Sequence, residues 1–372
     1  MRICFLSDYQ LIHTYRWAKF FVPKHEVHLI SLEAPSEKTS SIDPEKYEEL
    51  GIKLQIIPRK GLNKLFGPSR VRKLLREIKP NVVHAHYITH YGYLGATSGF
   101  HPLVMTAWGT DVLIEPHSSF IKKYQVKYAL KRVDIVTCDG DNTAKALAEF
   151  MKDGKKIRKI YFGVDTQKIH PSRRVEGFYK EHLKDGKGKV VIDLRGFYEI
   201  YDPDTYIKAI PAVLEKYPDT IFLMARESER RKIYEEMVDS MGIGNSVKFI
   251  GHVPADDLPV FLASADIYVS PSLSDSGISA STAEAMASGI SVISTDVGDI
   301  SHWIENGKNG FIIPKGDSRA LSEKIIYLIS NDEVRKSMGK EARIMIETRQ
   351  DYYKEMGKVE QLYETLVKEA RN

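Results

Sequence analysis

Short β-rich runs alternate with helical patterns along almost the whole of this 372-residue chain. Such alternation predicts parallel sheets covered by helices on both faces, so the expected class is α/β with doubly wound sheets. The strands expected in the first half are RICFL, EVHLIS, KLQII, NVVHAH, PLVMTA, DIVTC and KIYF, and those in the second are KVVIDL, TIFLMA, VKFIG, DIYVSP, ISVIST and GFIIP. Helices are expected near 68–78, 118–132, 142–152, 204–217, 229–241, 255–264, 279–288 and 317–330.

A hydrophilic stretch over 166–189 separates two halves of similar size, and a new strand begins at its end. We therefore expect one Rossmann-like domain over 1–170 and a second over 171–348. The tail over 332–370 is helical with no strand after it, and its last part, 349–372, is a candidate to cross back to the first domain. Doubly wound sheets bind ligands at the carboxyl ends of their strands, so a cleft between the domains is the expected site.

The composition is that of a globular chain, with 42% hydrophobic and 28% charged residues. No apolar run approaches the roughly 20 residues that a membrane-spanning helix needs. The opening MRICFLSD predicts a strand rather than a signal peptide. The two cysteines, Cys4 and Cys138, lie far apart in expected strands, which favours buried thiols and a reducing cytoplasm over a disulfide or a metal site.

Charge is distributed unevenly. Residues 1–170 hold 27 Lys and Arg against 17 Asp and Glu, a net +10, whereas the remaining residues hold 27 against 33, a net −6. A basic half of this kind suits an anionic partner, although a solvated Lys-rich surface is the simpler explanation for any one cluster. The basic segments are 70–79 and 120–134; the second interleaves aromatic residues with lysines and is interpreted either as an interfacial helix or as a core-packed helix with a Lys-rich outer face.

Several common motifs are absent from the sequence. No G-x-G-x-x-G follows either first strand, and there is no phosphate-binding P-loop, zinc-ligand spacing or G-x-S-x-G elbow. Asp139 and Asp141 form an Asp-x-Asp pair after a strand, which would suit a divalent cation. We favour a helix start there instead, because Asp, Asn142 and Thr143 are typical capping residues. No metal is expected, and the basic segments lack a motif for nucleic acid.

A lone carboxylate, Glu284, lies within the small-residue segment STAEAMASG, which follows a strand. A helix starting near Ser279 would present free backbone N–H groups and a positive dipole end, which suits a phosphate. Glu284 would lie about a turn and a half further along, where its oxygens can accept hydrogen bonds from two sugar hydroxyls. This segment is the strongest candidate for a ligand site in the chain.

At this point the chain resembles the retaining glycosyltransferases of the GT-B fold, specifically glycosyltransferase family 4. The run EAMASGISVISTDVGDISHWIENGKNGFIIPKGDSRALSEKI, residues 284–325, matches the family's long donor-site pattern. Other landmarks are FLSDYQLIHTYRWAKFF, KPNVVHAHYITHYGYLGA, PLVMTAWGTDVL, YFGVDTQKIHP and IGHVPADDLPVFLASADIYVSPS. The resemblance implies two Rossmann-like domains that face a central cleft.

The resemblance also implies roles for individual residues. Glu284 matches a glutamate that binds the donor ribose, and Arg195 matches the arginine that clamps the donor diphosphate through its planar fork. Gly277, Ile278 and Ser279 match the turn that meets donor sugar and phosphate. Residues that match the acceptor side are His13, Arg16, His86, Trp108, Gly109 and Asp111. The residues with implied catalytic roles are Arg195, Asp111 and Glu284.

Each of these roles has a structural alternative. Arg195 would then cap a strand end, Asp111 would be a helix N-cap, and His86 would be a hydrogen-bonded strand residue. The chain also departs from the family pattern at three positions. Ser276 stands where the family has a glutamate that contacts the donor sugar, with Asp275 beside it as a substitute; Ile200 replaces a diphosphate lysine; and Trp108 replaces a common active-site histidine.

The function implied is transfer of a sugar from a nucleoside diphosphate-sugar to a hydroxyl acceptor, with retention and with no metal or other cofactor. A lipid-linked or cell-surface glycan precursor is the expected acceptor, and the enzyme is expected in the cytoplasm, in contact with the inner face of an anionic membrane. A weakly catalytic sugar-nucleotide binding protein and a GT-B sugar-nucleotide epimerase are the alternatives. The sequence identifies neither the donor nucleotide and sugar, nor the acceptor, nor the oligomeric state.

Overall fold

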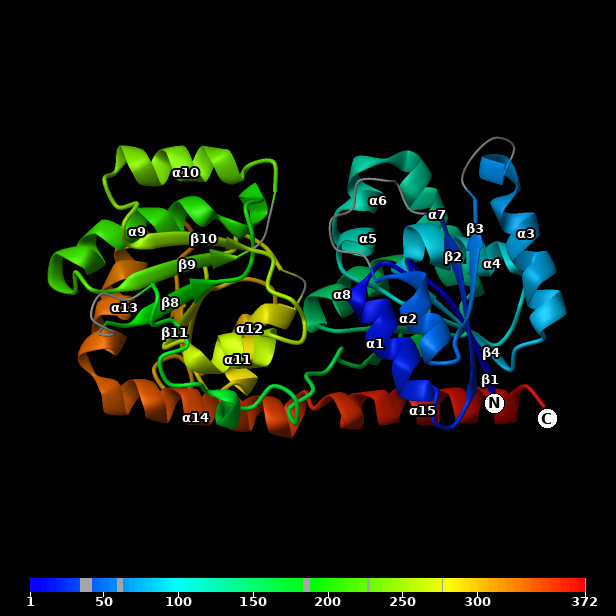
Figure 1. Ribbon diagram of the computed structural model, residues 1–372. Coiled ribbons are helices and arrows are strands. Elements are labelled where there is room, and N and C mark those ends of the chain that lie inside the picture. Colours follow the sequence, from blue (N-terminus) through cyan, green and yellow to red (C-terminus); the bar gives the residue numbers. More distant parts are fainter. Residues whose placement is uncertain (34–41, 59–62, 183–187, 226–227, 276, 372) are drawn as a thin grey trace. The chain divides into compact units, whose positions relative to one another are not determined.

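The computed structural model describes residues 1–33, 42–58, 63–182, 188–225, 228–275 and 277–371 (Figure 1). The chain divides into two compact units. Unit 1 contains Met1–Phe162 together with Tyr353–Asn372, and unit 2 contains Gly163–Tyr352. The first division falls eight residues before the expected boundary at 170, and the last helix belongs to unit 1.

Unit 1 is built on a seven-stranded parallel sheet with strand order β3-β2-β1-β4-β5-β6-β7. The chain runs outward in one direction from β1 to β3 and then crosses to β4 and runs outward in the other, which is a doubly wound topology. The carboxyl ends of β1 and β4 therefore lie side by side at the point where the order reverses. The strands are β1 (Arg2–Leu6), β2 (Glu26–Leu32), β3 (Lys53–Ile57), β4 (Val82–His86), β5 (Leu103–Thr106), β6 (Ile135–Cys138) and β7 (Ile157–Lys159).

Helices cover both faces of this sheet. One face packs through Leu6, Val83 and Met105 into a core with α3 (Asn63–Ile78), α4 (Tyr93–Ser98), α7 (Phe120–Arg132) and α8 (Asp141–Phe150). On the other face Phe5 contacts Phe21 of α1 (Ile12–Phe21), and His84 contacts Tyr363 of α15 (Tyr352–Glu369). The remaining helices of the unit are α2 (Pro44–Glu49), a π-helix at Tyr87–Gly92, α5 (Thr110–Leu113), α6 (Glu115–Ser118) and a 3₁₀ turn at Gly154–Lys156.

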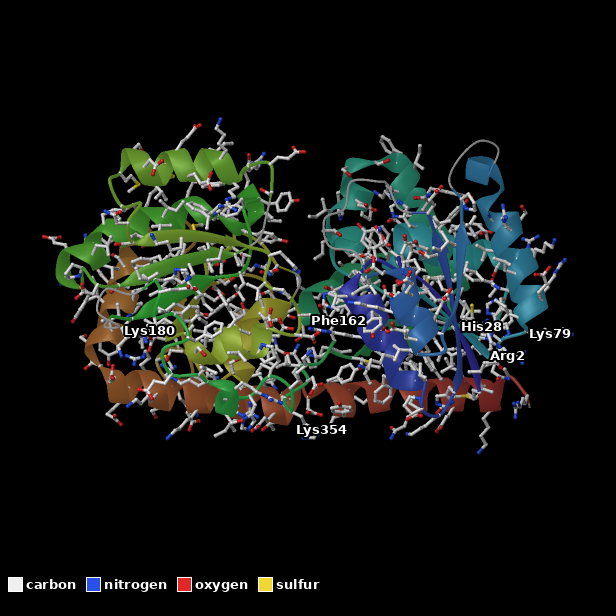
Figure 2. All side chains as sticks on the ribbon, in the orientation of Figure 1. Arg2, His28, Lys79, Phe162, Lys180 and Lys354 are labelled. Atoms are coloured by element: carbon white, nitrogen blue, oxygen red, sulfur yellow. The ribbon has the colours of Figure 1, made fainter. Side chains whose placement is uncertain are left out.

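The amino ends of the first three strands are joined by an ionic cluster. Glu26 accepts hydrogen bonds from Arg2 at 2.9 Å and from Lys53 at 2.6 Å. His28 lies close to Arg2 (Figure 2) and bonds the same carboxylate at 3.1 Å. These hydrogen bonds lower the pKa of Glu26 to about 2. The cluster is at the edge of the sheet opposite to the carboxyl ends of the strands, so it ties strands together away from the candidate site.

Unit 2 is a six-stranded parallel sheet with strand order β10-β9-β8-β11-β12-β13. Its strands are β8 (Val190–Asp193), β9 (Ile221–Ala225), β10 (Val247–Gly251), β11 (Ile267–Ser270), β12 (Ser291–Thr295) and β13 (Phe311–Ile313). The helices α9 (Pro203–Lys216), α10 (Arg231–Ser240) and α13 (Ser318–Ser330) build a core on one face. The helices α11 (Leu258–Ser264) and α12 (Ala280–Ala287) cover the other, and α14 (Asp332–Arg349) packs on α12 and β12 (Figure 1).

The expected α/β class is confirmed, as is the doubly wound arrangement of both sheets. One strand was wrongly placed: KIYF was expected, but β7 is Ile157–Lys159, because these residues pair with β6 and the chain leaves the sheet before Tyr161. The expected long tail is interrupted at Gln350 and Asp351, where Val164 forms a parallel bridge with Asp351. Within the described residues, no helix is both long and apolar enough to span a membrane.

Candidate active site

Arg195 is positioned by the end of β8. Asp193, the last residue of that strand, accepts a hydrogen bond from the backbone N–H of Arg195 at 2.7 Å and so turns the chain out of the sheet. The guanidinium then lies over the ring of Tyr201, 4.3 Å from its centroid, and its Nε donates to Ser272 Oγ at 3.1 Å. Ser272 follows β11, the strand next to β8. A fixed cation is therefore held at the carboxyl edge of the unit 2 sheet.

Asp275 is the direct partner of this cation. One terminal nitrogen of Arg195 donates to both carboxylate oxygens of Asp275, at 2.7 and 2.9 Å. The two side chains are only 11% and 18% exposed. Burial lowers the pKa of Arg195, but Asp275 together with Tyr268, Tyr201 and Asp193 outweighs this effect, and the net shift is upward. Burial raises the pKa of Asp275 despite the attraction of Arg195. Asp275 thus neutralises the positive charge of Arg195, to which the resemblance assigns the binding of the donor diphosphate.

The helix α12 begins where the sequence predicts. Ser279 is its N-cap, and the side chain accepts a hydrogen bond from the N–H of Thr282 at 3.2 Å. The remaining N–H groups of the first turn have no partner within the helix, which makes this end attractive to an anion. Glu284 lies in the second turn and is 7% exposed, so it is held inside the structure rather than extended into solvent. Ile278 is also buried, and Ser276 lies outside the described residues.

A glycine brings a second loop against this turn. Gly298, after β12, has a φ of +57°, and a Cβ placed on it would lie 2.6 Å from the carbonyl oxygen of Gly277 and 2.9 Å from that of Asp275. Only a residue without a side chain permits this approach. The segments after β8 and β12 therefore both reach the described residues that follow β11, namely Ser272, Asp275 and Gly277. The arrangement brings Arg195, Asp275 and the start of α12 together, as the resemblance implied for a donor site.

In unit 1, Asp111 clamps two loops together. Its Oδ2 accepts the N–H of Ile88 at 2.7 Å and its Oδ1 accepts the N–H of Trp108 at 3.0 Å. The residue is 0% exposed, and burial raises its pKa to about 6. In this structure the enclosed carboxylate holds the loops of Ile88 and Trp108 in place, and its implied contact with an acceptor or a donor sugar stays a prediction. Gly109, which starts α5, has a φ of +103° that suits only glycine.

His86 is also a buried residue and not a surface contact. It ends β4, is 1% exposed, and its Nδ1 bonds Ser7 Oγ at 3.2 Å. Burial, assisted by the charge of His13, lowers its pKa to about 3, so His86 is neutral at physiological pH. These contacts fit the structural alternative, a hydrogen-bonded strand residue, and the implied contact of His86 with an acceptor stays a prediction. The neighbouring His84 is fully buried between Thr106 and Tyr363, and burial lowers its pKa as well.

Three half-buried aromatic residues, His13, Trp108 and Phe162, lie together at this edge. His13 lies 5.8 Å from Trp108 in an edge-on arrangement and 5.2 Å from Phe162, measured between ring centroids. Trp108 and Phe162 are also perpendicular, 6.0 Å apart; Figure 2 labels Phe162. Arg16 lies three residues after His13 on α1 and is likewise half-buried. Of the residues expected on the acceptor side, His13, Arg16 and Trp108 are the ones that are partly accessible.

Some residues of this edge were not found by sequence reasoning. Tyr87 has a left-handed φ of +69°, and its hydroxyl bonds Thr110 at 3.0 Å and Glu115 at 3.0 Å. Glu115 in turn lies 3.3 Å from Lys122. Strained residues that open a π-helix commonly mark functional sites. No local sequence pattern predicts this cluster, because its members come from the π-helix after β4 and from α5, α6 and α7.

A helix starts after β6 as expected, but it begins already at Asp141 and its N-cap is Gly140 without a side-chain capping bond, so the expected capping role of these polar residues is corrected. Asp141 is the first residue of α8, and its Oδ1 lies 2.8 Å from Lys159 Nζ on β7. Cys4 and Cys138 are free thiols in strands, and burial raises both of their pKa values. The ion pair with Lys159 satisfies the charge of Asp141 locally.

Two family models match the chain. Residues 176–345 match glycosyl transferases group 1, and residues 2–140 match the glycosyl transferase 4-like model. The chain is 21% identical over 353 residues to N-acetyl-alpha-D-glucosaminyl L-malate synthase of Bacillus anthracis, covering 94% of this chain and 91% of that protein. It is 27% identical over 289 residues to an uncharacterized glycosyltransferase of Methanocaldococcus jannaschii, covering 76% of each.

Solved structures agree on the fold. The crystal structure of HepE from Anabaena in complex with UDP-glucose superimposes with a TM-score of 0.82 and 19% identity, covering 98% of this chain and 100% of that one. One family model falls in each unit, and the relatives span most of the chain. The chain therefore belongs to the family 4 glycosyltransferases of the GT-B fold.

Proposed function

We propose that this glycosyltransferase takes its sugar from a nucleoside diphosphate-sugar bound to unit 2 and transfers it to a hydroxyl group with retention of configuration. The observation that carries the proposal is the contact of Arg195 with Ser272 and Asp275, in the segment that leads to the N-cap of α12 at Ser279. A fixed guanidinium and a helix N-terminus at one edge form a site for two phosphate groups. HepE, which shares the fold, was crystallised with UDP-glucose and with UDP, and this supports the same class of donor.

The proposed step breaks the bond between the sugar C1 and the diphosphate oxygen and forms a bond from C1 to the acceptor oxygen. The acceptor proton moves to an oxygen of the departing diphosphate on the same face of the sugar. Negative charge develops on that diphosphate, and Arg195 and the first turn of α12 would stabilise it. One preorganised donor of this kind is typically worth about 3–4 kcal/mol of barrier. No side-chain base is required in this scheme, and neither is a metal ion.

Glu284 would hold the ribose of the donor. Its carboxylate is buried in the second turn of α12, one turn beyond the proposed phosphate position. A carboxylate accepts hydrogen bonds from two neighbouring hydroxyls, which a ribose presents and a deoxyribose does not. Because Ile200 replaces the lysine of the family pattern, Arg195 would carry more of the diphosphate charge here than in relatives. Asp275 must then release Arg195, at least in part, when the donor binds.

The acceptor is proposed to bind unit 1, where His13, Arg16 and Trp108 are accessible. We propose a lipid-linked or cell-surface glycan precursor as the acceptor, with the reaction on the cytoplasmic side of a membrane. The net charge of +10 in residues 1–170 supports an anionic surface as partner. Two curated relatives are named as mannosyltransferases that act on phosphatidylinositol derivatives, which supports a lipid acceptor as a class.

The test is a thermal-shift titration of wild type, Glu284→Ala and Glu284→Gln with UDP, GDP, ADP, dTDP and CMP. We expect one diphosphate to stabilise the wild type, Glu284→Ala to lose that shift, and Glu284→Gln to keep part of it, since an amide oxygen still accepts. Donor hydrolysis and transfer are then measured with the sugar nucleotide so identified. A thermal shift without turnover would favour a weakly catalytic binding protein. Release of an epimerised donor would favour the sugar-nucleotide epimerase. If no nucleotide shifts the melting temperature, the donor site is contradicted.

A further inference from the structure

The outer face of α7 exposes large apolar side chains. Phe120 is 93% exposed and Ile121 is 71% exposed, the two highest values among the large apolar residues that the structure describes. Tyr124, one turn further along, is 59% exposed, and Ile114, just before α6, is 47% exposed. Single exposed apolar residues are ordinary, but four within eleven positions form a patch of the kind that marks an interaction surface.

The core does not account for this patch. The inner face of α7 is formed by Val126, Ala129 and Leu130, which are buried and spaced at i, i+3 and i+4. Phe120 and Tyr124 lie on the opposite side of the helix, because each residue turns the side-chain direction by about 100°. The helix therefore carries apolar residues on two faces, of which only one packs against the sheet. Folding of unit 1 does not require the outer set.

Lysines continue the same outer stripe. Phe120, Tyr124, Lys127 and Lys131 follow one another at i, i+4, i+7 and i+11, and Lys123 lies beside them. All three of these lysines are exposed, and α7 contains five Lys and Arg but no acidic residue. Lys122 differs, because it turns back to Glu115 and His90. One further cation lies nearby: Arg72 of α3 donates to carbonyl groups at the end of α4, which packs on α7.

We propose that this face, defined as Ile114, Phe120, Ile121 and Tyr124 with Lys123, Lys127 and Lys131, docks on an anionic phospholipid bilayer. The apolar tips would enter the boundary between headgroups and acyl chains while the lysines contact anionic headgroups. The stripe places the aromatic residues in the first turns of the helix and the lysines after them. Docking would hold the enzyme where a lipid-linked acceptor is found, and only this purpose rests on the proposed function.

Charge selects the bilayer over a second copy of this chain. Face-to-face self-association would bring Lys123, Lys127 and Lys131 of two copies together with no acidic residue on α7 to compensate. An anionic membrane supplies the missing negative charge, and each lysine near such a surface contributes about a fivefold gain in binding. The Tyr128 ring, over which Arg132 lies at 3.7 Å, borders the stripe and adds a further amphipathic group.

The experiment is flotation of the full chain with vesicles of phosphatidylcholine alone and of phosphatidylcholine mixed with phosphatidylglycerol. Variants are Phe120→Ser with Ile121→Ser, and Lys123→Glu with Lys127→Glu. The matched control is Lys232→Glu with Ile233→Ser on α10, since Ile233 is 59% exposed and Lys232 is exposed as well. All substituted side chains are outside the cores, so the fold should be retained, and circular dichroism checks it.

We expect wild type and the α10 control to float with the anionic vesicles, and salt to weaken the binding. The serine pair should lower the partition coefficient at least about tenfold and the glutamate pair at least about 25-fold. Failure of wild type to float, or equal flotation by all variants, overturns the proposal. Sedimentation velocity without lipid provides a further test, because a dimer lost in the serine pair would assign the face to a second copy instead. If the protein floats with anionic vesicles but no nucleotide shifts its melting temperature, the membrane surface is supported and the proposed donor site is contradicted.

Discussion

Both carboxylate oxygens of Asp275 accept hydrogen bonds from one nitrogen of Arg195, although the two residues are 80 positions apart. The pair is mostly buried, and Ser272 and Tyr201 fix the same guanidinium from two other directions. Arg195 is thus preorganised, and the negative group that it faces in this structure belongs to the protein. A diphosphate must compete with that carboxylate.

Replacing Asp275 by asparagine is expected to tighten binding of the nucleoside diphosphate, by roughly five- to tenfold. The amide oxygen keeps one hydrogen bond to Arg195 but removes the competing charge, so more of the guanidinium is available to phosphate. Arg195→Ala should weaken the same binding more than tenfold. Isothermal titration calorimetry with UDP or the diphosphate found by thermal shift measures both. Weaker binding by Asp275→Asn would mean that the carboxylate orients the arginine for its ligand.

Gly298→Ala is expected to abolish most nucleotide binding. Its new Cβ would meet the carbonyl oxygens of Gly277 and Asp275, so the loop that forms the donor site must move. Gly316→Ala is the matched control, because Gly316 also has a positive φ, +70°, but has open space around it. Both variants pay the backbone strain of about 1 kcal/mol, and only the first displaces the loop. Equal nucleotide affinities in the two variants would contradict the proposed contact.

Asp111→Ala should destabilise unit 1 without touching the donor site. The substitution leaves the buried N–H groups of Ile88 and Trp108 without an acceptor, at a cost of about 1–3 kcal/mol each. The melting temperature should fall by several degrees. The UDP affinity of unit 2, measured well below that temperature, should stay unchanged. Asp141→Ala is the control, since that carboxylate is half-buried and its ion pair with Lys159 contributes little. Normal stability with lost transfer would restore a direct chemical role for Asp111.

Stability is expected to fall in mildly acidic solution. The pKa of His86 is about 3 in the folded protein against an ordinary 6.5, so the unfolded chain binds a proton that the folded chain does not. Below pH 6.5 the free energy of unfolding should therefore fall by about 1.4 kcal/mol per pH unit for this residue, and His84 adds in the same direction. Asp111 acts oppositely between its ordinary value and about 6. Urea midpoints of wild type and His86→Gln, measured from pH 7 to 4, isolate the contribution of His86 to this pH dependence. If the two proteins lose stability in parallel as the pH falls, that contribution is refuted.

Much of the fold follows from local pattern. Buried parallel strands such as Val190–Asp193 and Ile267–Ser270 are continuous apolar runs bounded by turn residues, and twelve of the thirteen expected strands are found where they were placed. β7 was misplaced because KIYF is as apolar as a strand, while its partner β6 pairs only with Ile157–Lys159. The break at Gln350 and Asp351 was missed because it depends on contacts with Val164 and Thr166, far away in sequence.

The sequence predicts which residues belong to the candidate site, but not which of them are in contact. The helix that starts at Ser279 follows from capping chemistry, and the placement of Arg195 follows from its position after a strand. Its pairing with Asp275 and its stacking on Tyr201 depend on tertiary geometry. The same reason explains Asp111 and His86: a polar residue at or beyond the carboxyl end of a strand suits both a ligand contact and a buried hydrogen bond. Only the exposed fraction, 0% and 1%, distinguishes the two cases.

The placement of α15 has a consequence for synthesis on the ribosome. This helix buries Met356, Val359 and Tyr363 against unit 1, yet it is translated only after all of unit 2. Residues 1–162 therefore emerge with α1 on this face of their sheet but without α15, and 190 further residues are made before α15 covers the rest of it. Unit 2 is continuous and can fold as soon as it leaves the tunnel, so the domain that is made first is the one completed last.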